Sequence, residues 1–95
     1  EFLAPAYIND TVTIAGRVTC VGNTSMEVCV DTFVEHVDNP TQRQHVNRAF
    51  LTMVAIGKDG KPTQVPSLIP ETLEEKMDFT AGERRRLMRM RNMNK

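Results

Sequence analysis

The sequence has 95 residues, of which 40% are hydrophobic, and its 12 basic and 12 acidic side chains give a net charge of zero. This length allows one small domain, and the zero net charge excludes a global attraction to nucleic acid or to an anionic membrane. No apolar run approaches the roughly 18 residues of a membrane span, and residues 1–10 lack the features of a signal peptide.

Residues 11–21 and 25–37 each alternate apolar and polar side chains, as half-buried strands do. Between them, Gly22-Asn23-Thr24 predicts a β-hairpin turn in which Gly and Asn supply positive φ. A loop centred on Asn23 places Val18 opposite Val28, and a slip of one residue would turn every side chain to the other face. The pattern therefore fixes the pairing of the two strands.

In this pairing Cys20 and Cys29 point to opposite faces, so we expect no disulfide between them, which fits a reducing compartment. Arg17 lies diagonal to Glu27 and Asp31, which predicts a minor surface pairing. Four acids are candidate general bases by residue type only, and acids on the outer face of a strand are usually solvated. These acids are Asp10, Glu27, Asp31 and Glu35.

Residues 35–45 are polar and predict a loop with a turn at Asn39-Pro40. Residues 46–57 are apolar on both alternating sides, which predicts a central strand covered on both faces. Residues 58–61 form a turn, and the three prolines in residues 62–70 favour extended backbone.

From Glu71 the pattern becomes helical, and Thr72 with Glu75 predicts a capping box at the start. A second capping box at Thr80-Ala81-Gly82-Glu83 allows a break there. Residues 84–95 contain bases and no acid, and we interpret them as a solvated, frayed helix end. The alternative is that these bases reach a nucleotide phosphate or a partner. The sheet is left without a covering helix, so either a partner covers it or the complete domain has another helix.

Eight pieces of the chain follow one another in the order and spacing of a known family. They are Phe2, Pro5, Asn9–Val12, Val21–Val28, Val46–Ala55, Gly60–Pro62, Val65–Pro66 and Pro70–Glu75. In this respect the chain resembles the hotdog-fold acyl-CoA thioesterases. It departs from the family pattern at three positions, where Asn9 replaces Gly, Asn23 replaces Arg and Val46 replaces Thr.

The resemblance implies an α+β hotdog fold, with an antiparallel sheet and residues 71–95 as a charged C-terminal helix. It implies that residues 1–95 are one partial hotdog domain, which lacks the family's N-terminal strand and its central helix. The Asp that activates water in this family lies in that N-terminal part, so we expect no catalytic residue in this chain and an Asp upstream of Glu1.

The resemblance places the hairpin tip, Gly22, Asn23, Thr24 and Ser25, beside coenzyme A. Asn23 keeps a hydrogen-bonding group there but loses the charge of the family's arginine. Phe2, Pro5 and Asn47 are implied to lie near the substrate. Asn47 has a second interpretation, as an ordinary polar residue at the start of a strand.

The implied function is hydrolysis of fatty acyl-CoA to a free acid and coenzyme A, by a homo-oligomer that is a dimer or a trimer of dimers. Coenzyme A is then part of the substrate and product, and we expect no separate cofactor, no metal, no nucleic acid and no membrane. The alternative is a non-catalytic hotdog module for dimerisation or for binding coenzyme A or an acyl carrier. We expect residues 1–95 alone to be inactive, and the location to be the cytoplasm or, alternatively, the mitochondrial matrix.

Overall fold

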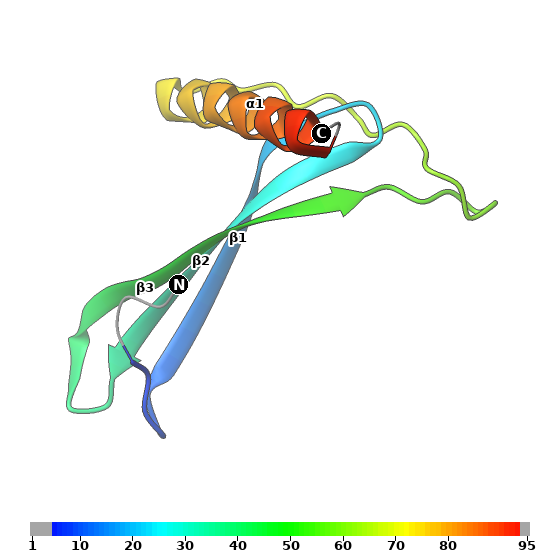
Figure 1. The fold of residues 1–95 in the computed structure, drawn as a ribbon. Coiled ribbons are helices and arrows are strands. Elements are labelled where there is room, and N and C mark those ends of the chain that lie inside the picture. The colour runs from blue at the N-terminus through cyan, green and yellow to red at the C-terminus, as the bar shows by residue number, and fades with distance from the viewer. Residues whose placement is uncertain (1–4, 94–95) are drawn as a thin grey trace. The chain divides into compact units, whose positions relative to one another are not determined.

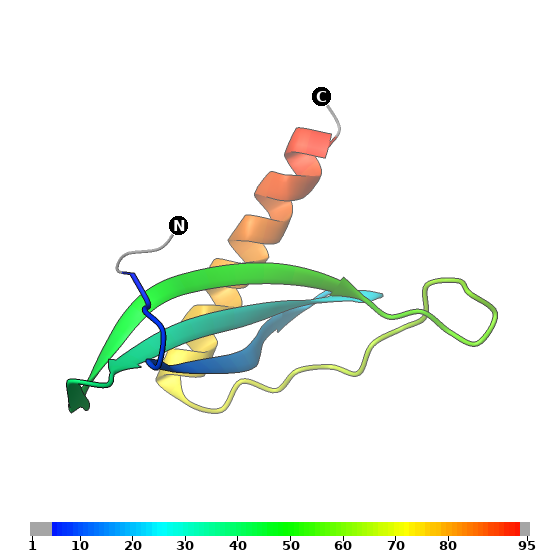
Figure 2. The same ribbon diagram turned by 90° about the horizontal axis from the view of Figure 1, so that it is seen from below.

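The computed structural model describes residues 5–93, which form three strands and one helix (Figure 1). The strands are β1 (Thr11–Val21), β2 (Ser25–His36) and β3 (Asn39–Val54), and the helix is α1 (Leu73–Met93). Short turns join consecutive strands, and β2 lies between β1 and β3 in the sheet (Figure 2). The antiparallel sheet followed by a helix agrees with the predicted fold class.

Two compact units make up the described chain: residues 5–17 with 29–51, and residues 18–28 with 52–93. In the first unit, the apolar face predicted from the alternation is present. Val34 and Val46 are each 1% exposed, and they line an open apolar hollow of about 460 Å³ together with Val12 and Ile14. Val12 and Ile14 remain largely exposed, so this face has little cover from the described residues.

The predicted polar loop over residues 35–45 is wrong, because most of this segment is strand. The turn is confined to Val37 and Asp38, and β3 begins at Asn39. The residue before a proline is biased to extended backbone, which lets Asn39 start a strand at Asn39-Pro40. The N–H of Val37 donates to Asp10 Oδ1 at 3.2 Å and holds the short turn.

The prediction of a central, fully covered strand at residues 46–57 is also wrong within this chain. β3 is an edge strand of the described sheet, and β2 is the middle strand. Large apolar side chains on β3 are between 42% and 52% exposed, namely Phe50, Leu51, Met53 and Val54. An edge strand of this length with apolar side chains is a surface on which another chain can pair.

In the second unit, the predicted turn at residues 58–61 is confirmed. Gly57 N donates to Lys61 O at 2.8 Å, and Gly60 has φ of 78°. The hairpin tip differs from the prediction, because neither Gly22 nor Asn23 has positive φ. Gly22 N donates instead to Ser25 O at 2.8 Å, and the side chain of Arg86 lies close to Gly22.

Helix α1 starts with the predicted capping box. The N–H of Glu75 donates to Thr72 Oγ1 at 3.0 Å, and the N–H of Thr72 donates to Glu75 Oε1 at 2.9 Å. The break allowed at Thr80 does not occur, because the Thr80 hydroxyl donates to Lys76 O at 3.1 Å within a continuous helix. The helix lies against residues 18–28, the tip end of the β1–β2 hairpin (Figure 1).

Candidate functional site

The hairpin tip, Gly22 to Ser25, is held in place through its main chain. The N–H of Val65 donates to Asn23 O at 2.9 Å, and the N–H of Ala55 donates to Thr24 O at 2.9 Å. Two other segments of the second unit therefore hold the main chain of the tip. These bonds fix the backbone of the predicted coenzyme A-binding residues without using their side chains.

Glu27 joins the same hairpin to helix α1. Its carboxylate accepts two hydrogen bonds from Arg85, at 2.8 and 2.7 Å, and one from the Thr19 hydroxyl at 2.6 Å. Arg85 is the main reason that the pKa of Glu27 is lowered. Glu27 is only 8% exposed, so the expectation of a solvated acid is wrong here, because the helix covers this end of the strand.

Helix α1 can approach the hairpin closely because position 82 carries no side chain. A Cβ atom at Gly82 would lie 2.6 Å from Cys20 Cβ and 3.0 Å from Glu27 Oε1. Burial at this seam raises the pKa of the Cys20 thiol. Gly82 therefore permits the contact that brings the arginines of α1 to the hairpin.

Arg86 covers the main chain of Gly22. A Cβ atom at Gly22 would lie 2.9 Å from Arg86 Nε and 3.0 Å from Arg86 Cζ. The small space at this point, about 10 Å³, is also lined by Ser25 and Arg89. A side chain at position 22 would therefore have to displace the guanidinium group of Arg86, and the backbone of Gly22 is not left-handed.

These arginines were missed as site residues, because the base-rich end of the sequence was interpreted as a solvated tail. A usable signal was present in the spacing. Arg85, Arg86 and Arg89 follow Gly82 by three, four and seven residues, which places all of them on the helix face that Gly82 brings to the hairpin.

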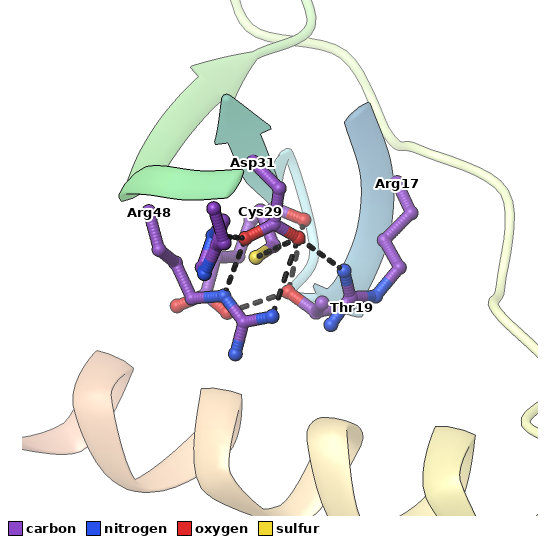
Figure 3. A network of polar contacts seen from close by, with 7 residues as sticks. Arg17, Thr19, Cys29, Asp31 and Arg48 are labelled. Atoms are coloured by element: carbon purple, nitrogen blue, oxygen red, sulfur yellow. Dashed lines mark hydrogen bonds and ion pairs between the residues drawn. The ribbon is translucent and has the colours of Figure 1, made fainter. Parts of the chain in front are cut away.

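Asp31 is the centre of a polar cluster in the first unit (Figure 3). Its carboxylate accepts hydrogen bonds from Arg48 Nε at 2.6 Å, from Arg48 Nη2 at 3.3 Å and from Arg17 Nη1 at 3.0 Å, and His45 Nε2 lies 2.8 Å away. Arg48 contributes most to lowering the pKa of Asp31 to about 2. The predicted Arg17–Asp31 pairing is confirmed, but Asp31 is buried, at 4% exposed.

Asp10 holds the entrance to β1. Its Oδ2 atom accepts a hydrogen bond from the N–H of Tyr7 at 2.8 Å, and His36 Nδ1 lies 2.7 Å from the same oxygen. The bond from Tyr7 is the main cause of the lowered pKa of Asp10. Asn9, where the family pattern has Gly, has φ of 75°, so its backbone conformation explains the glycine of the family.

The remaining predicted residues belong to the first unit or lie outside the description. Pro5 lines the apolar hollow with Val34 and Val46. Asn47 Oδ1 is buried and has no hydrogen-bond partner among the described residues, so this side chain has an unused acceptor. Phe2 lies outside the described residues. In the part of the chain from 5 to 93, no group of acids, histidines and cysteines could hold a metal ion.

Comparison with known proteins finds a family model and several relatives that are similar to this chain. Residues 1–40 match the Thioesterase superfamily. The cytosolic acyl coenzyme A thioester hydrolase of Rattus norvegicus is 43% identical over 77 residues, which are 80% of this chain and 20% of the rat protein.

Two solved structures share the fold. An apo-hexameric acyl-CoA thioesterase has a TM-score of 0.86 at 34% identity, over 98% of this chain and 59% of that chain. An acyl-CoA hydrolase from Staphylococcus aureus, in complex with butyryl coenzyme A, coenzyme A and coenzyme A disulfide, has a TM-score of 0.77 at 30% identity, over 99% of this chain and 59% of that chain.

The chain spans about a fifth of the rat relative and about three fifths of the two solved chains. Over that span, the resemblance to the hotdog-fold acyl-CoA thioesterases is confirmed in sequence and in fold. In the described part of the chain, no helix combines the length and the apolar sequence that crossing a lipid bilayer requires.

Proposed function

We propose that the protein is an acyl-CoA thioesterase, which hydrolyses the thioester of fatty acyl-CoA to a free acid and coenzyme A. The observation that carries this proposal is the likeness of 99% of the chain, at a TM-score of 0.77, to a hydrolase that was solved with butyryl coenzyme A. In the proposal, residues 22–25 supply groups on the coenzyme A side, and the sheet supplies contacts between subunits.

The state of three of the four candidate carboxylates supports a catalytic acid outside residues 1–95. Asp10, Glu27 and Asp31 each accept hydrogen bonds from a cation or from the main chain, and the pKa of each is lowered. A carboxylate with a lowered pKa and occupied oxygens is a poor general base. In the proposal, the water that attacks the thioester carbonyl is activated by an acid outside residues 1–95, as the family resemblance implies.

In this mechanism water adds to the carbonyl carbon, and the carbonyl oxygen takes up negative charge. A backbone N–H at the start of the central helix of the family stabilises that charge. The tetrahedral intermediate then collapses, the carbon–sulfur bond breaks, and coenzyme A leaves as the thiolate, which takes up the proton. This chain's part in these steps is to hold the coenzyme A portion of the substrate.

The test is a thioesterase assay that detects the released thiol of coenzyme A, with butyryl-, decanoyl- and palmitoyl-CoA as substrates. A form of the protein that carries the upstream part found in its longer relatives is expected to hydrolyse at least one of them. Residues 1–95 alone are expected to be inactive. Absence of hydrolysis by the longer form would refute the proposed activity, and hydrolysis by residues 1–95 would refute the external acid.

A non-catalytic module is the second candidate, and the occupied carboxylates favour it. In that case the protein binds coenzyme A or an acyl carrier, or it only dimerises. Binding of coenzyme A by the longer form without hydrolysis of any acyl-CoA would identify this case. The same assay, combined with calorimetry, therefore separates the two functions.

We also infer a homo-oligomer, either a dimer or a trimer of dimers. The exposed apolar side chains of β3 support this inference, as does the hexameric structure among the similar proteins. We expect light scattering to give a mass of at least two subunits, and Leu51→Lys to lower that mass. A monomer at micromolar concentration would contradict the inference.

We further propose where the protein is located and which partners it has. The cytoplasm is favoured by the rat relative, whose name describes it as cytosolic, and the mitochondrial matrix is the alternative. Acyl-CoA is the proposed small-molecule partner, without a separate cofactor, metal, nucleic acid or membrane. Fractionation of the source cells tests the location.

A further inference from the structure

Helix α1 turns most of its large apolar side chains away from the hairpin on which it packs. Its contacts with the hairpin include Gly82, Arg85 and Arg86. Four large apolar side chains of the helix are instead between 62% and 74% exposed, namely Leu73, Met77, Leu87 and Met88. The helix therefore covers the hairpin with a largely polar face and exposes an apolar one, which is typical of a surface that associates with a partner.

The exposed apolar side chains lie together on the outer face of α1. At about 100° per residue, Met77, Leu87 and Met88 lie within about 60° of Leu73 around the helix, and Gly82 lies about 180° from it. The middle of this outer face is a shallow hollow of about 420 Å³, lined by Lys76, Met77, Thr80, Ala81 and Arg84. Small side chains at the middle of a helix face allow a second helix to approach closely.

The residues of the outer face are spaced evenly about the middle of the helix. Going outward from the middle, the positions at equal distances are Thr80 and Ala81, Met77 and Arg84, and Leu73 and Met88. When a second copy of α1 lies antiparallel on this face, each of these positions lies level with its counterpart in the partner. A two-fold axis between identical chains requires this kind of self-complementary spacing.

The charges of α1 favour the same antiparallel orientation. The first turn contains Glu74 and Glu75, and the last turn contains Arg91. Antiparallel helices place the acidic start of each beside the basic end of the other, and their dipoles are opposed. Lys76 and Glu83 lie only about 20° apart around the helix, at the edge of the outer face, so that Lys76 of each copy faces Glu83 of the partner subunit. Parallel helices would instead place like charges together.

We propose that the outer face of α1 is an interface with a second copy of this chain, in which the two helices pack antiparallel about a two-fold axis near Thr80 and Ala81. The interface goes beyond the proposed function and does not depend on thioesterase activity. It uses other residues than the contact through β3. A dimer needs only one of the two contacts, whereas a trimer of dimers needs both.

The first test is disulfide cross-linking of cysteine variants of the longer form, followed by electrophoresis without reductant. In the antiparallel pair, Leu73 lies level with Met88 of the partner subunit, whereas the two copies of Leu73 are about 22 Å apart along the helix, which is farther than a disulfide spans. Leu73→Cys co-expressed with Met88→Cys is therefore expected to cross-link, and neither variant is expected to cross-link alone.

The matched control is Leu73→Cys co-expressed with Met90→Cys. Two residues turn the side chain by about 200° around the helix, so this mixture should not cross-link. Equal cross-linking of the two mixtures, or none in either, overturns the interface. Cross-linking of Leu73→Cys with itself overturns the antiparallel orientation.

The second test measures mass by light scattering after a change of charge at one position. Met77 lies level with Arg84 of the partner subunit, so Met77→Lys brings like charges together and Met77→Glu brings opposite charges together, while both remove the same apolar side chain. We expect Met77→Lys to lower the mass by at least about half, because like charges across an interface oppose association. Met77→Glu should keep the mass of the natural protein, and equal effects of the two variants overturn the pairing.

The outcomes also separate the interface from the proposed function. Cross-linking of Leu73→Cys with Met88→Cys in a protein that hydrolyses no acyl-CoA supports the interface and refutes the thioesterase. A mass lowered by Leu51→Lys but not by Met77→Lys overturns the interface and leaves the contact through β3. Unchanged masses, with Met77→Lys binding vesicles of phosphatidylserine more strongly than Met77→Glu, assign the outer face to a lipid surface and overturn the interface.

Discussion

Asp31 shows how a single buried carboxylate depends on its cations. It is 4% exposed, and its oxygens accept hydrogen bonds from both Arg17 and Arg48. Such a group is stable as an anion only while its partners remain, and the partners would repel one another without it. Asp31→Asn is therefore expected to destabilise the fold by about 3 kcal/mol at pH 7, which urea unfolding would measure.

The pH dependence of the stabilisation by Asp31 follows from the direction in which its pKa is shifted. The pKa of Asp31 falls from 3.8 to about 2 in the folded protein, so its contribution is complete above pH 4 and is lost as the pH falls toward 2. The difference in unfolding free energy between the natural protein and Asp31→Asn should shrink over this range. A difference that stays constant down to pH 2 would contradict the role of the charge. Thr32→Ser, on the neighbouring residue, serves as a control.

Asn9 illustrates a constraint of the main chain at the same scale. Its φ of 75° lies in the left-handed region, which Gly and Asn tolerate and branched residues do not. We expect Asn9→Gly to change stability by less than about 0.5 kcal/mol and Asn9→Val to destabilise by about 1–2 kcal/mol. Thermal unfolding of the two variants tests this, and equal melting temperatures would show that the strain is absent.

At the scale of elements, Gly82 reverses an ordinary expectation for helices. Glycine inside a helix normally costs about 1 kcal/mol relative to alanine, so Gly→Ala is usually stabilising. Here the new Cβ would lie 2.6 Å from Cys20 Cβ, an atom close to the main chain that cannot move aside. Gly82→Ala is thus expected to destabilise by about 1–3 kcal/mol.

The matched control for Gly82→Ala is Thr80→Ala, because Thr80 lies on the same helix and is exposed. Urea unfolding of both variants gives the comparison. A more stable Gly82→Ala protein would mean that α1 does not lie against the hairpin in solution.

Sequence patterns correctly predicted the elements that are determined by residues close together in the sequence. The alternation of residues 11–21, the turn at 58–61 and the capping box at Thr72 are all present. The loop at 35–45 was wrong because polar residues can pair as an edge strand when a short turn is held from outside, as Asp10 holds Val37. The amino-acid composition of residues 35–45 does not reveal the hydrogen bond between Val37 and Asp10.

The candidate site was less predictable, because its parts are far apart in sequence. Residues 22–25 were identified through the family resemblance, which gave the tip but not its neighbours. The burial of Glu27 and the position of Arg86 depend on how α1 packs on the hairpin. An acid on a strand and a base on a helix look solvated until the packing of the two elements is known.

On the scale of the whole molecule, two compact units share one chain, and each contains one cysteine. Cys29 is 0% exposed and belongs to the unit with residues 5–17, whereas Cys20 is 2% exposed and lies under Gly82 in the other unit. Neither is in a disulfide. A thiol reagent can reach each sulfur atom only after its own surroundings open.

The alkylation rates of the two thiols therefore report on two separate opening events. Cys20 should be alkylated at the rate at which α1 lifts from the hairpin, and Cys29 at the rate at which the middle of the sheet opens. Mass spectrometry of peptides after timed alkylation would give both rates. Equal alkylation rates of the two thiols would instead show that the chain opens as one cooperative body.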